Sequence, residues 1–338
     1  MTRELKVDPD DPVFRARVED LTSASIVSAE FPGGKSRSTI RLRLSNGETV
    51  FATARRRSSH ATQELKILWA LRKFGAACPQ VIGVEEGFFL QSDVGPQRMS
   101  QALAVATEAE RFDLLSRALQ SLATAQDALR DAGLADDLAE IGGSEEARLE
   151  RARLPASLAE KLDVPPPDLD VSAIADRLAV LDHAAIKFDS RPANAIVGED
   201  GAIAWIDWDR AGRRNLVDDV VCLLADEYMR HAPETEGKLL DLHLHHFSGK
   251  RSVPQAQDYM AIAGCLHCCF RLELILKKIR ETGRWSDAQK CLREDRVGSA
   301  PEFVSRLCQT GARWATSSAE IHDLEAFFAA IEMRFLQQ

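Results

Sequence analysis

Hydrophobic and polar positions alternate with a period of two in the first part of the chain. Residues 24–31 (Ala-Ser-Ile-Val-Ser-Ala-Glu-Phe) read as a strand, and residues 39–44 (Thr-Ile-Arg-Leu-Arg-Leu) read as another with one polar face. Asn46-Gly47 is a strong signal for a two-residue hairpin turn, so residues 49–54 are expected to return as a third strand. A loop, Pro32-Gly33-Gly34-Lys35-Ser36, separates the first two strands. The pattern predicts a small antiparallel sheet.

A helical period and two more strands follow this sheet. Apolar residues at helical spacing over 60–74 predict a helix that stops at Gly75. Residues 79–84 and 87–92 then read as two short strands. The sheet with its one helix ends near residue 97, so we expect residues 1–97 to form an N-terminal lobe.

The remainder of the chain, residues 98–338, has a different texture. Ala, Leu, Glu and Arg dominate it, and helices are predicted at 100–134, at 136–162, at 171–181 and over most of the chain after Asp218. Strand signals return only at 195–197 and 203–206, on either side of a glycine-containing turn. The order of elements predicts an α+β, two-lobed protein: a small antiparallel β N-lobe with one helix, and a larger, mainly α-helical C-lobe.

Composition and charge limit the classes of partner that the protein is expected to bind. The 338 residues are 45% hydrophobic and carry a net charge of −9, so no basic surplus calls for a nucleic acid. The charged N-terminus lacks an apolar signal core, and no uninterrupted apolar run suits a bilayer. We therefore expect a cytoplasmic protein without a membrane partner; the oligomeric state stays open.

Seven cysteines, an odd number in a large chain, do not suggest a disulfide framework. The run Cys265-Leu-His267-Cys268-Cys269 invites a zinc interpretation. It lies in an apolar, helical stretch, however, and no second pair stands at zinc-finger spacing. We interpret these cysteines as small core residues.

Candidate chemistry is concentrated in the loop from Lys187 to Asn194, which reads Lys-Phe-Asp-Ser-Arg-Pro-Ala-Asn. Asp189 suits a base that accepts the proton of an attacking hydroxyl. Asn194, five residues later, offers a hard oxygen ligand for Mg²⁺. Arg191 lies where a cation could meet a transferring phosphate, and Lys187 either contacts phosphate or stabilises the loop.

A second motif, Ala204-Trp-Ile-Asp207-Trp-Asp209, follows the predicted hairpin. Asp207 ends a strand and would supply a charged ligand to Mg²⁺ that bridges the phosphates of ATP. The hairpin brings this motif next to Asp189 and Asn194. The three residues together predict phosphoryl transfer in one cleft.

The sequence Asp-x-x-x-x-Asn, a hairpin and then Ile-Asp-Trp-Asp resembles the aminoglycoside phosphotransferase and choline kinase family, which has the protein-kinase-like fold. The resemblance covers roughly residues 24–230. It implies ATP and Mg²⁺ as cofactors and a hydroxyl group of a small molecule (a sugar, an aminoglycoside or an amino alcohol) as acceptor. It also implies that Asp219 is a structural aspartate that starts the next helix. From the residues alone, we expect Asp209 and Asp219 to fix the ends of a loop and a helix rather than to touch substrate.

The resemblance assigns a nucleotide-binding role to several N-lobe residues. Gly33, Gly34 and Lys35 lie in the loop that would cover the nucleotide. Glu64 occupies the position of the helical glutamate that pairs with a strand cation, for which Arg55 or Arg56 is the nearest candidate. Gln91 and Asp93 lie at the approach to the hinge between the lobes, near the expected adenine.

Three positions depart from the family pattern. Lys187 replaces the usual histidine, Phe188 the usual glycine, and an arginine the strand lysine. Arginine binds phosphate oxygens bidentately, so nucleotide binding is compatible with the last change. These departures keep a second hypothesis open: a nucleotide-binding pseudokinase with a regulatory or scaffold role.

Two further alternatives have less support. A protein kinase is disfavoured because no Ala-Pro-Glu segment follows Asp207. A P-loop at Lys35-Ser36 is disfavoured because Ala29 stands where its first glycine belongs and a strand pattern follows. Several acids of the C-lobe would favour a cationic acceptor if they lined the cleft: Asp218, Asp219, Asp226, Glu227, Glu234 and Glu236.

Overall fold

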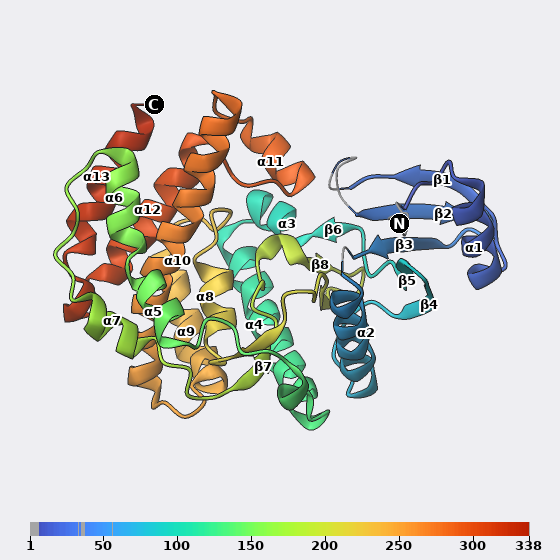
Figure 1. The fold of residues 1–338 in the computed structure, drawn as a ribbon, viewed down its shortest axis with the longest axis horizontal. Helices are drawn as coiled ribbons and strands as arrows, with labels where there is room; N and C mark the ends of the chain where they lie inside the picture. The colour runs from blue at the N-terminus through green and yellow to red at the C-terminus, as the bar shows by residue number, and fades with distance from the viewer. Residues whose placement is uncertain (1–6, 33, 35–37, 56, 338) are drawn as a thin grey trace.

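The computed structural model describes residues 7–32, 34, 38–55 and 57–337. Its strands and helices form two lobes (Figure 1). The smaller lobe contains one sheet, and the larger is built mainly from helices, as predicted. We retain a division near residue 97 as a proposal.

The N-lobe sheet has five antiparallel strands in the order β1-β2-β3-β5-β4. Their bounds are β1 (Ile26–Glu30), β2 (Thr39–Leu44), β3 (Thr49–Ala54), β4 (Val81–Glu85) and β5 (Phe88–Ser92). The predicted turn joins β2 to β3: Gly47 donates its N–H to the Leu44 carbonyl at 3.0 Å and has a φ of +87°. A positive φ suits glycine because it has no Cβ. The turn and the strand pattern together confirm the predicted sheet.

The alternation of side chains gives this sheet two different faces. Ile40 and Leu42 of β2 are buried on one face, in a core shared with Phe14 of helix α1 (Pro12–Thr22). Thr39 and Arg41 of the same strand lie on the opposite face and line the cleft. The sheet therefore separates an apolar core from the interlobe site.

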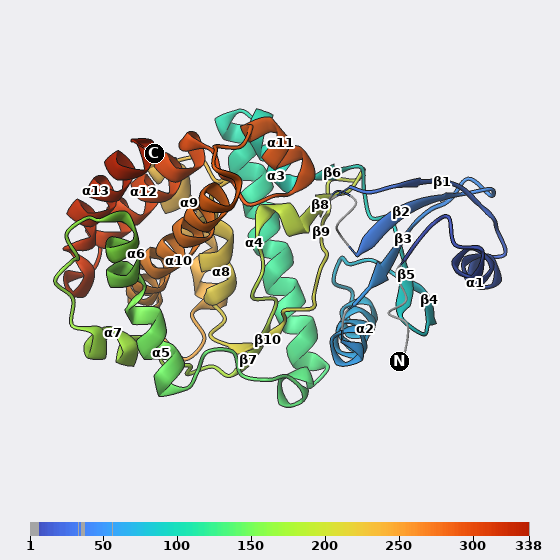
Figure 2. The ribbon, with the colours of Figure 1, turned by 45° about the horizontal axis from the view of Figure 1, so that its top comes forward.

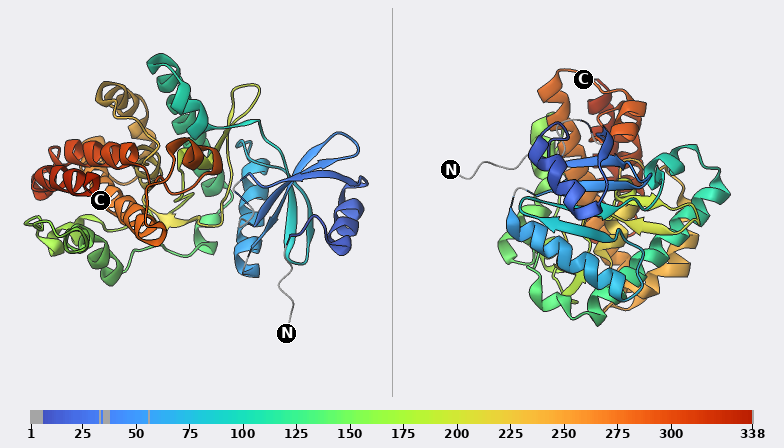
Figure 3. Two further views of the ribbon diagram at one scale, coloured as in Figure 1. Left: turned by 90° about the horizontal axis from the view of Figure 1, so that it is seen from above. Right: turned by 90° about the vertical axis from the view of Figure 1, so that its right-hand side faces the viewer.

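Helix α1 is a second N-lobe helix, in addition to the one predicted. Asp11 caps it, accepting a hydrogen bond from the backbone N–H of Val13 at 2.9 Å, and Pro12 occupies its first turn. Both are helix-start signals that the sequence carries. The helix packs on the apolar face of the sheet, at the end of the N-lobe that is farthest from the C-lobe (Figure 3).

The predicted helix after β3 is α2 (Ser58–Lys73). Its buried residues Leu65, Ile67 and Leu68 belong to the large core that continues into the C-lobe. Most of the buried residues of the sheet and of α1 form a second core, although Phe89 of β5 belongs to the large one. Helix α2 thus packs against α4 (Glu108–Asp131) of the C-lobe as well as beneath the sheet (Figure 2).

Most of the C-lobe helices share one core around α10, whereas the buried residues of α11 belong to a small separate cluster. Their bounds are α3 (Met99–Val105), α4 (Glu108–Asp131), α5 (Glu145–Ala152), α6 (Leu154–Leu162), α7 (Val171–Arg177), α8 (Asp218–Leu224), α9 (Pro233–Phe247), α10 (Val253–Thr282), α11 (Ala288–Glu294), α12 (Pro301–Ala315) and α13 (Leu324–Leu336). The stretch predicted as a single helix from 100 to 134 is divided. Thr107 and Glu110 form a capping box that starts α4, so α3 ends before it.

Helix α10 carries the apolar stretch that contains Cys265, Cys268 and Cys269, all of them buried. By length and composition α10 could cross a membrane. However, 78% of its most apolar window is buried inside the protein. We therefore regard it as the core helix of the C-lobe.

Two small sheets position the chemistry. The predicted hairpin is formed by β8 (Ala195–Val197) and β9 (Ile203–Trp205), and β6 (Gln97–Arg98) pairs with β8. A second pair, β7 (Ala184–Ile186) with β10 (Gly212–Arg214), was not predicted. Strand β7 leads into the loop that begins at Lys187, and β9 leads to Asp207, so the two motifs start side by side.

Candidate active site

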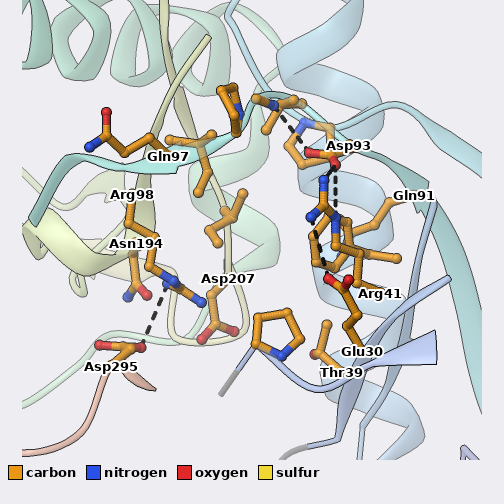
Figure 4. Close-up of a pocket in the computed structure, with 18 of the residues that line it drawn as sticks. Glu30, Thr39, Arg41, Gln91, Asp93, Gln97, Arg98, Asn194, Asp207 and Asp295 are labelled. Atoms are coloured by element: carbon orange, nitrogen blue, oxygen red, sulfur yellow. Dashed lines mark hydrogen bonds and ion pairs between the residues drawn. The ribbon is translucent and has the colours of Figure 1, made fainter. Parts of the chain in front are cut away.

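A cavity of about 490 Å³ lies between the lobes (Figure 4). The N-lobe lines it with Thr39, Arg41 and Arg55, and the C-lobe with Asn194 and Asp207. The structure thus brings together residues from both lobes that are more than 150 positions apart in the sequence. The volume suits a small-molecule ligand.

Asp189 and Asn194 are joined directly. The Asn194 amide nitrogen donates to Asp189 Oδ2 at 2.9 Å and to the Asp189 carbonyl at 3.0 Å. Because these bonds use the nitrogen, they leave the Asn194 amide oxygen for a metal ion. The short helical turn Pro192–Asn194 sets the spacing of the two residues.

Asp219, in the first turn of α8, holds this loop through hydrogen bonds to its backbone. Its carboxylate accepts the backbone N–H groups of Lys187 at 3.1 Å and Phe188 at 2.8 Å. Burial raises its pKa, and the hydrogen bonds it accepts, first that of Gln126, oppose the rise. Asp219 therefore holds the loop that presents Asp189, the structural role expected from the resemblance.

Phe188, where the family has glycine, adopts a φ of +60°. This left-handed conformation disfavours residues with a Cβ. The N–H bond to Asp219 fixes the backbone, and the Phe188 ring packs on the guanidinium of Arg214, 5.1 Å from its centroid. The geometry that glycine gives without strain is thus retained here with a phenylalanine.

Asp207 lies near Asn194 on the C-lobe side of the cleft, where the Ile206 N–H donates to the Asn194 carbonyl at 2.9 Å, and it also has a φ of +60°. Its side chain is 40% exposed, and Oδ1 accepts a hydrogen bond from Arg55 at 2.7 Å. A carboxylate and an amide oxygen facing one cavity form a donor set that fits Mg²⁺. Asp207 and Asn194 are the residues that would hold the ion.

Arg55 takes the place of the strand lysine. It binds Glu64 bidentately, at 2.6 Å and 2.8 Å, in addition to its bond to Asp207. Burial raises the pKa of Glu64, and the bonds from Arg55 oppose that rise. Glu64 also accepts the backbone N–H of Trp208 at 3.2 Å, so it ties α2 to the metal-site loop. Arg56, the other candidate, lies outside the described residues.

Lys187, which we placed among the catalytic residues, does not face the cleft. Its side chain is fully buried, and its ammonium donates to the carbonyls of Ile206 at 2.5 Å and Asp207 at 2.6 Å. It also lies 4.9 Å from the ring of Trp208. These contacts correct the expectation of a phosphate contact: Lys187 positions the backbone of Asp207.

Arg191 also points away from the position expected for a transferring phosphate. Its Nε donates to Asp226 at 2.6 Å, and Nη2 lies 3.6 Å from Glu227. Burial lowers the pKa of Arg191, but these two acids more than offset this effect and raise it. Arg191 therefore connects the catalytic loop to Asp226 and Glu227. The expectation that it contacts phosphate is corrected: its role in this structure is to hold the loop.

The other predicted nucleotide-site residues lie on the N-lobe side. Gln91 lines the cavity while its amide donates to Thr53 at 2.8 Å. Asp93, in the connection between the lobes, binds Arg41 at 2.7 Å. Gly34 has a φ of +85°, whereas Gly33 and Lys35 lie outside the described residues. The base of their loop, Glu30 to Pro32, lines the cavity.

The sequence did not indicate several residues at the rim of the cleft. Arg98 of β6 lies 3.7 Å from Asp295, and residues 293–295 at the end of α11 also line the cavity. Arg41 did carry a signal, since the basic positions of 39–44 alternate with apolar ones. Residues 293–295 carried none, because only the packing of α11 brings them to the cleft.

Comparison with known proteins agrees with this architecture. The profile of the phosphotransferase enzyme family matches residues 28–252, two thirds of the chain. The chain belongs to this family. A comparison with curated protein sequences gives no significant match.

Solved structures with this fold include several small-molecule kinases. The amicoumacin kinase hAmiN is 13% identical with a TM-score of 0.53, covering 89% of this chain and 98% of that chain. The aminoglycoside phosphotransferase APH(2")-IIa, solved with gentamicin, is 16% identical with a TM-score of 0.52, covering 89% and 97%. The macrolide 2'-phosphotransferase MphH from Brachybacterium faecium is 13% identical with a TM-score of 0.52, covering 82% and 95%. These likenesses confirm the two-lobed, protein-kinase-like fold.

Proposed function

We propose that this protein transfers the γ-phosphoryl group of ATP to a hydroxyl group of a small molecule, with Mg²⁺ as cofactor. The observation that carries the proposal is that Asn194 and Asp207 line one cleft and that Asn194 is bonded to Asp189. The amicoumacin kinase with this fold was solved with AMP-PNP and Ca²⁺, and an aminoglycoside phosphotransferase with ATP and streptomycin. Both complexes are consistent with a nucleotide in this cleft.

In the proposed reaction, the Asp189 carboxylate accepts the proton of the acceptor hydroxyl. The hydroxyl oxygen forms a bond to the γ-phosphorus as the bond to the β–γ bridging oxygen breaks, and ADP leaves. Asn194 orients Asp189 through its amide nitrogen. A Mg²⁺ ion on Asp207 and the Asn194 oxygen would neutralise charge on the phosphates. Lys187 holds the Asp207 backbone, so the two sides of the site keep their spacing.

Arg55 is proposed to bind the phosphates in place of the strand lysine. Its Nε and Nη2 are used by Glu64 and Asp207, and the residue lines the cavity. Of its nitrogens, Nη1 is therefore the one to meet a phosphate oxygen. A planar guanidinium serves three partners at once, which an ammonium does with less directional control.

The charge of the C-lobe acids bears on the acceptor. Five of the six acids that would attract a cation already have partners. Asp218 binds Arg214, Asp219 the backbone of the catalytic loop, Asp226 Arg191, Glu227 Arg271, and Glu236 Arg313. Only Glu234 of the six is exposed to solvent. We therefore favour an uncharged, sugar-like acceptor over a polycationic one.

The test compares nucleotide binding and turnover in matched variants. Asp189→Ala should abolish acceptor-dependent ADP release but keep the ATP-induced rise in Tm. Asp207→Asn should weaken the Mg²⁺-dependent part of that rise. Asp200→Asn, in the exposed turn of the same hairpin, is the control and should behave like the wild type. Full turnover by the Asp189 variant would overturn the proposal.

The acceptor is identified by an ATP-consumption screen over sugars, amino alcohols and aminoglycosides. Turnover with an uncharged sugar and not with an aminoglycoside is expected. Turnover with aminoglycosides alone would overturn the charge argument and leave the phosphotransferase proposal intact. ATP binding without turnover on any acceptor would instead favour the pseudokinase alternative.

A further inference from the structure

Four arginines line the interlobe cleft, and its described lining contains no lysine or histidine: Arg41, Arg55, Arg98 and Arg293. A guanidinium binds an oxyanion best through the N–H groups of Nε and Nη2, which point in the same direction and fit two oxygens at once. Whether one of these arginines can bind a new anion therefore depends on whether its Nε and Nη2 are already occupied.

Carboxylates occupy Nε and Nη2 in two of the four arginines. Those of Arg41 donate to Asp93 at 3.1 Å and 2.7 Å. Those of Arg55 donate to Glu64 at 2.6 Å and 2.8 Å. An anion in the cleft would have to compete with a carboxylate for either pair. Arg293 is exposed to solvent near the end of α11.

Arg98 of β6 is arranged differently. Its described contacts use Nη1, which donates to the Ala193 carbonyl and lies 3.7 Å from Oδ2 of Asp295. The second distance is too long for a hydrogen bond. Nε and Nη2 of Arg98 form no hydrogen bond with the described residues, and neither atom is fully buried. Arg98 therefore lines the cleft with both of these nitrogens available to an anion.

Contacts with the catalytic loop set the position of Arg98. Figure 4 shows its guanidinium directed into the cavity, beside Asn194 and Asp207. Ala193, whose carbonyl accepts its hydrogen bond, directly precedes Asn194, and the backbone of Arg98 pairs with Ile196 of β8. Main chain and side chain thus hold the guanidinium next to the residues that would bind Mg²⁺. A metal ion held there would bring the phosphates of a nucleotide close to Arg98.

The described C-lobe lining contains no other cation apart from the exposed Arg293. Lys187 and Arg191, the cations expected at the phosphate, are buried in other contacts. We propose that Arg98 binds phosphate oxygens of the nucleotide through Nε and Nη2, on the C-lobe side of the site, while Arg55 does so on the N-lobe side. This inference rests on the proposed phosphotransfer.

Two other roles of Arg98 would give different measurements. If it only held the Ala193 carbonyl, it would act through Asn194 and the metal ion, so its loss would not weaken nucleotide binding without a metal. If it bound the acceptor, its loss would raise the KM for the acceptor alone. A direct contact with phosphate contributes to ATP binding with or without Mg²⁺, because the hydrogen bonds do not involve the ion.

The first experiment is calorimetric titration in EDTA with ATP and with adenosine, which lacks the phosphates. Arg98→Gln should weaken ATP binding at least about tenfold and leave the affinity for adenosine within about twofold, because only ATP loses a charge-assisted contact. Arg296→Gln is the matched control. It removes the same charge from the residue after Asp295, where the side chain is 48% exposed and paired with Glu294, and should retain the affinity for ATP.

Unchanged ATP affinity in the Arg98 variant, or an equal loss of affinity for ATP and adenosine, would refute the inference alone. A wild-type protein that binds no ATP even with Mg²⁺ would instead refute the proposed function. Wild-type crystals grown with AMP-PNP give a test that is independent of any variant. Nε or Nη2 of Arg98 is expected within about 3.2 Å of a phosphate oxygen, and a guanidinium that contacts no phosphate oxygen would overturn the inference.

Discussion

The left-handed conformation of Phe188 gives a quantitative prediction about the catalytic loop. We compare Phe188→Gly with Phe188→Ala. Both variants lose the same ring contact with Arg214, so that loss cancels between them. The two variants differ in how readily residue 188 adopts the left-handed conformation. Asp219 holds the backbone there at a φ of +60° by accepting the N–H of residue 188.

The magnitude follows from two opposing effects. A residue with a Cβ in the left-handed region costs roughly 1–2 kcal/mol, and glycine avoids this cost. Glycine loses more backbone entropy on folding, which costs roughly 0.5–1 kcal/mol relative to alanine. The glycine variant should therefore be more stable than the alanine variant by about 0.5–1 kcal/mol, the reverse of the usual order.

Urea unfolding of both variants measures this difference. The control is the same pair at Gln120, an exposed position within α4, where alanine should be more stable than glycine by about 1 kcal/mol. If alanine is at least as stable as glycine at position 188 while Gln120 behaves as expected, the strain argument is refuted.

Two further predictions concern buried charges of the C-lobe. Arg191→Met leaves Asp226, whose pKa burial raises to about 6, and Glu227 without their shared cation. Urea unfolding should show a loss of about 3–5 kcal/mol, partly restored by adding Asp226→Asn; a loss below 1 kcal/mol would contradict the role assigned to the pair. Burial lowers the pKa of His243, which is bonded to Ser116 at 2.7 Å, so the native state resists its protonation. Stability should fall as the pH drops below about 6.5, the ordinary value, and His243→Gln should lose less stability between pH 8 and pH 5; equal losses would contradict this.

The sequence predicted those parts of the fold that local signals determine. The turn at Asn46-Gly47, the strands around it and helix α2 follow from alternation, turn residues and helical spacing. The pairing of β7 with β10 was not predicted, because no turn joins these two three-residue strands along the chain, whereas a glycine-containing turn joins β8 and β9. The break between α3 and α4 was readable in Thr107 and Glu110, but a continuous Ala- and Leu-rich pattern concealed it.

For the site, the sequence supplied the order of the motifs but not the direction of the side chains. Asp189, Asn194 and Asp207 converge because the β8–β9 hairpin returns the chain to the same edge. Lys187 and Arg191 are cations in the same loop, and either could have pointed into the cleft. Both side chains are instead buried away from it. Two backbone carbonyls accept the hydrogen bonds of Lys187, and two acids pair with Arg191; neither arrangement can be recognised from the local sequence.

The division of the hydrophobic core has a mechanical consequence. Helix α2 belongs by sequence to the N-lobe, yet it shares the core of the C-lobe. Two polar contacts add to this attachment: Gln63 donates to the Ala211 carbonyl at 2.8 Å, and Lys66 lies 3.2 Å from Asp137. The moving part during opening of the cleft would then be the sheet with α1, swinging over a stationary α2. Arg55, at the end of β3, would lie at the hinge of this motion, because its bond to Glu64 of α2 connects the moving part to the stationary part.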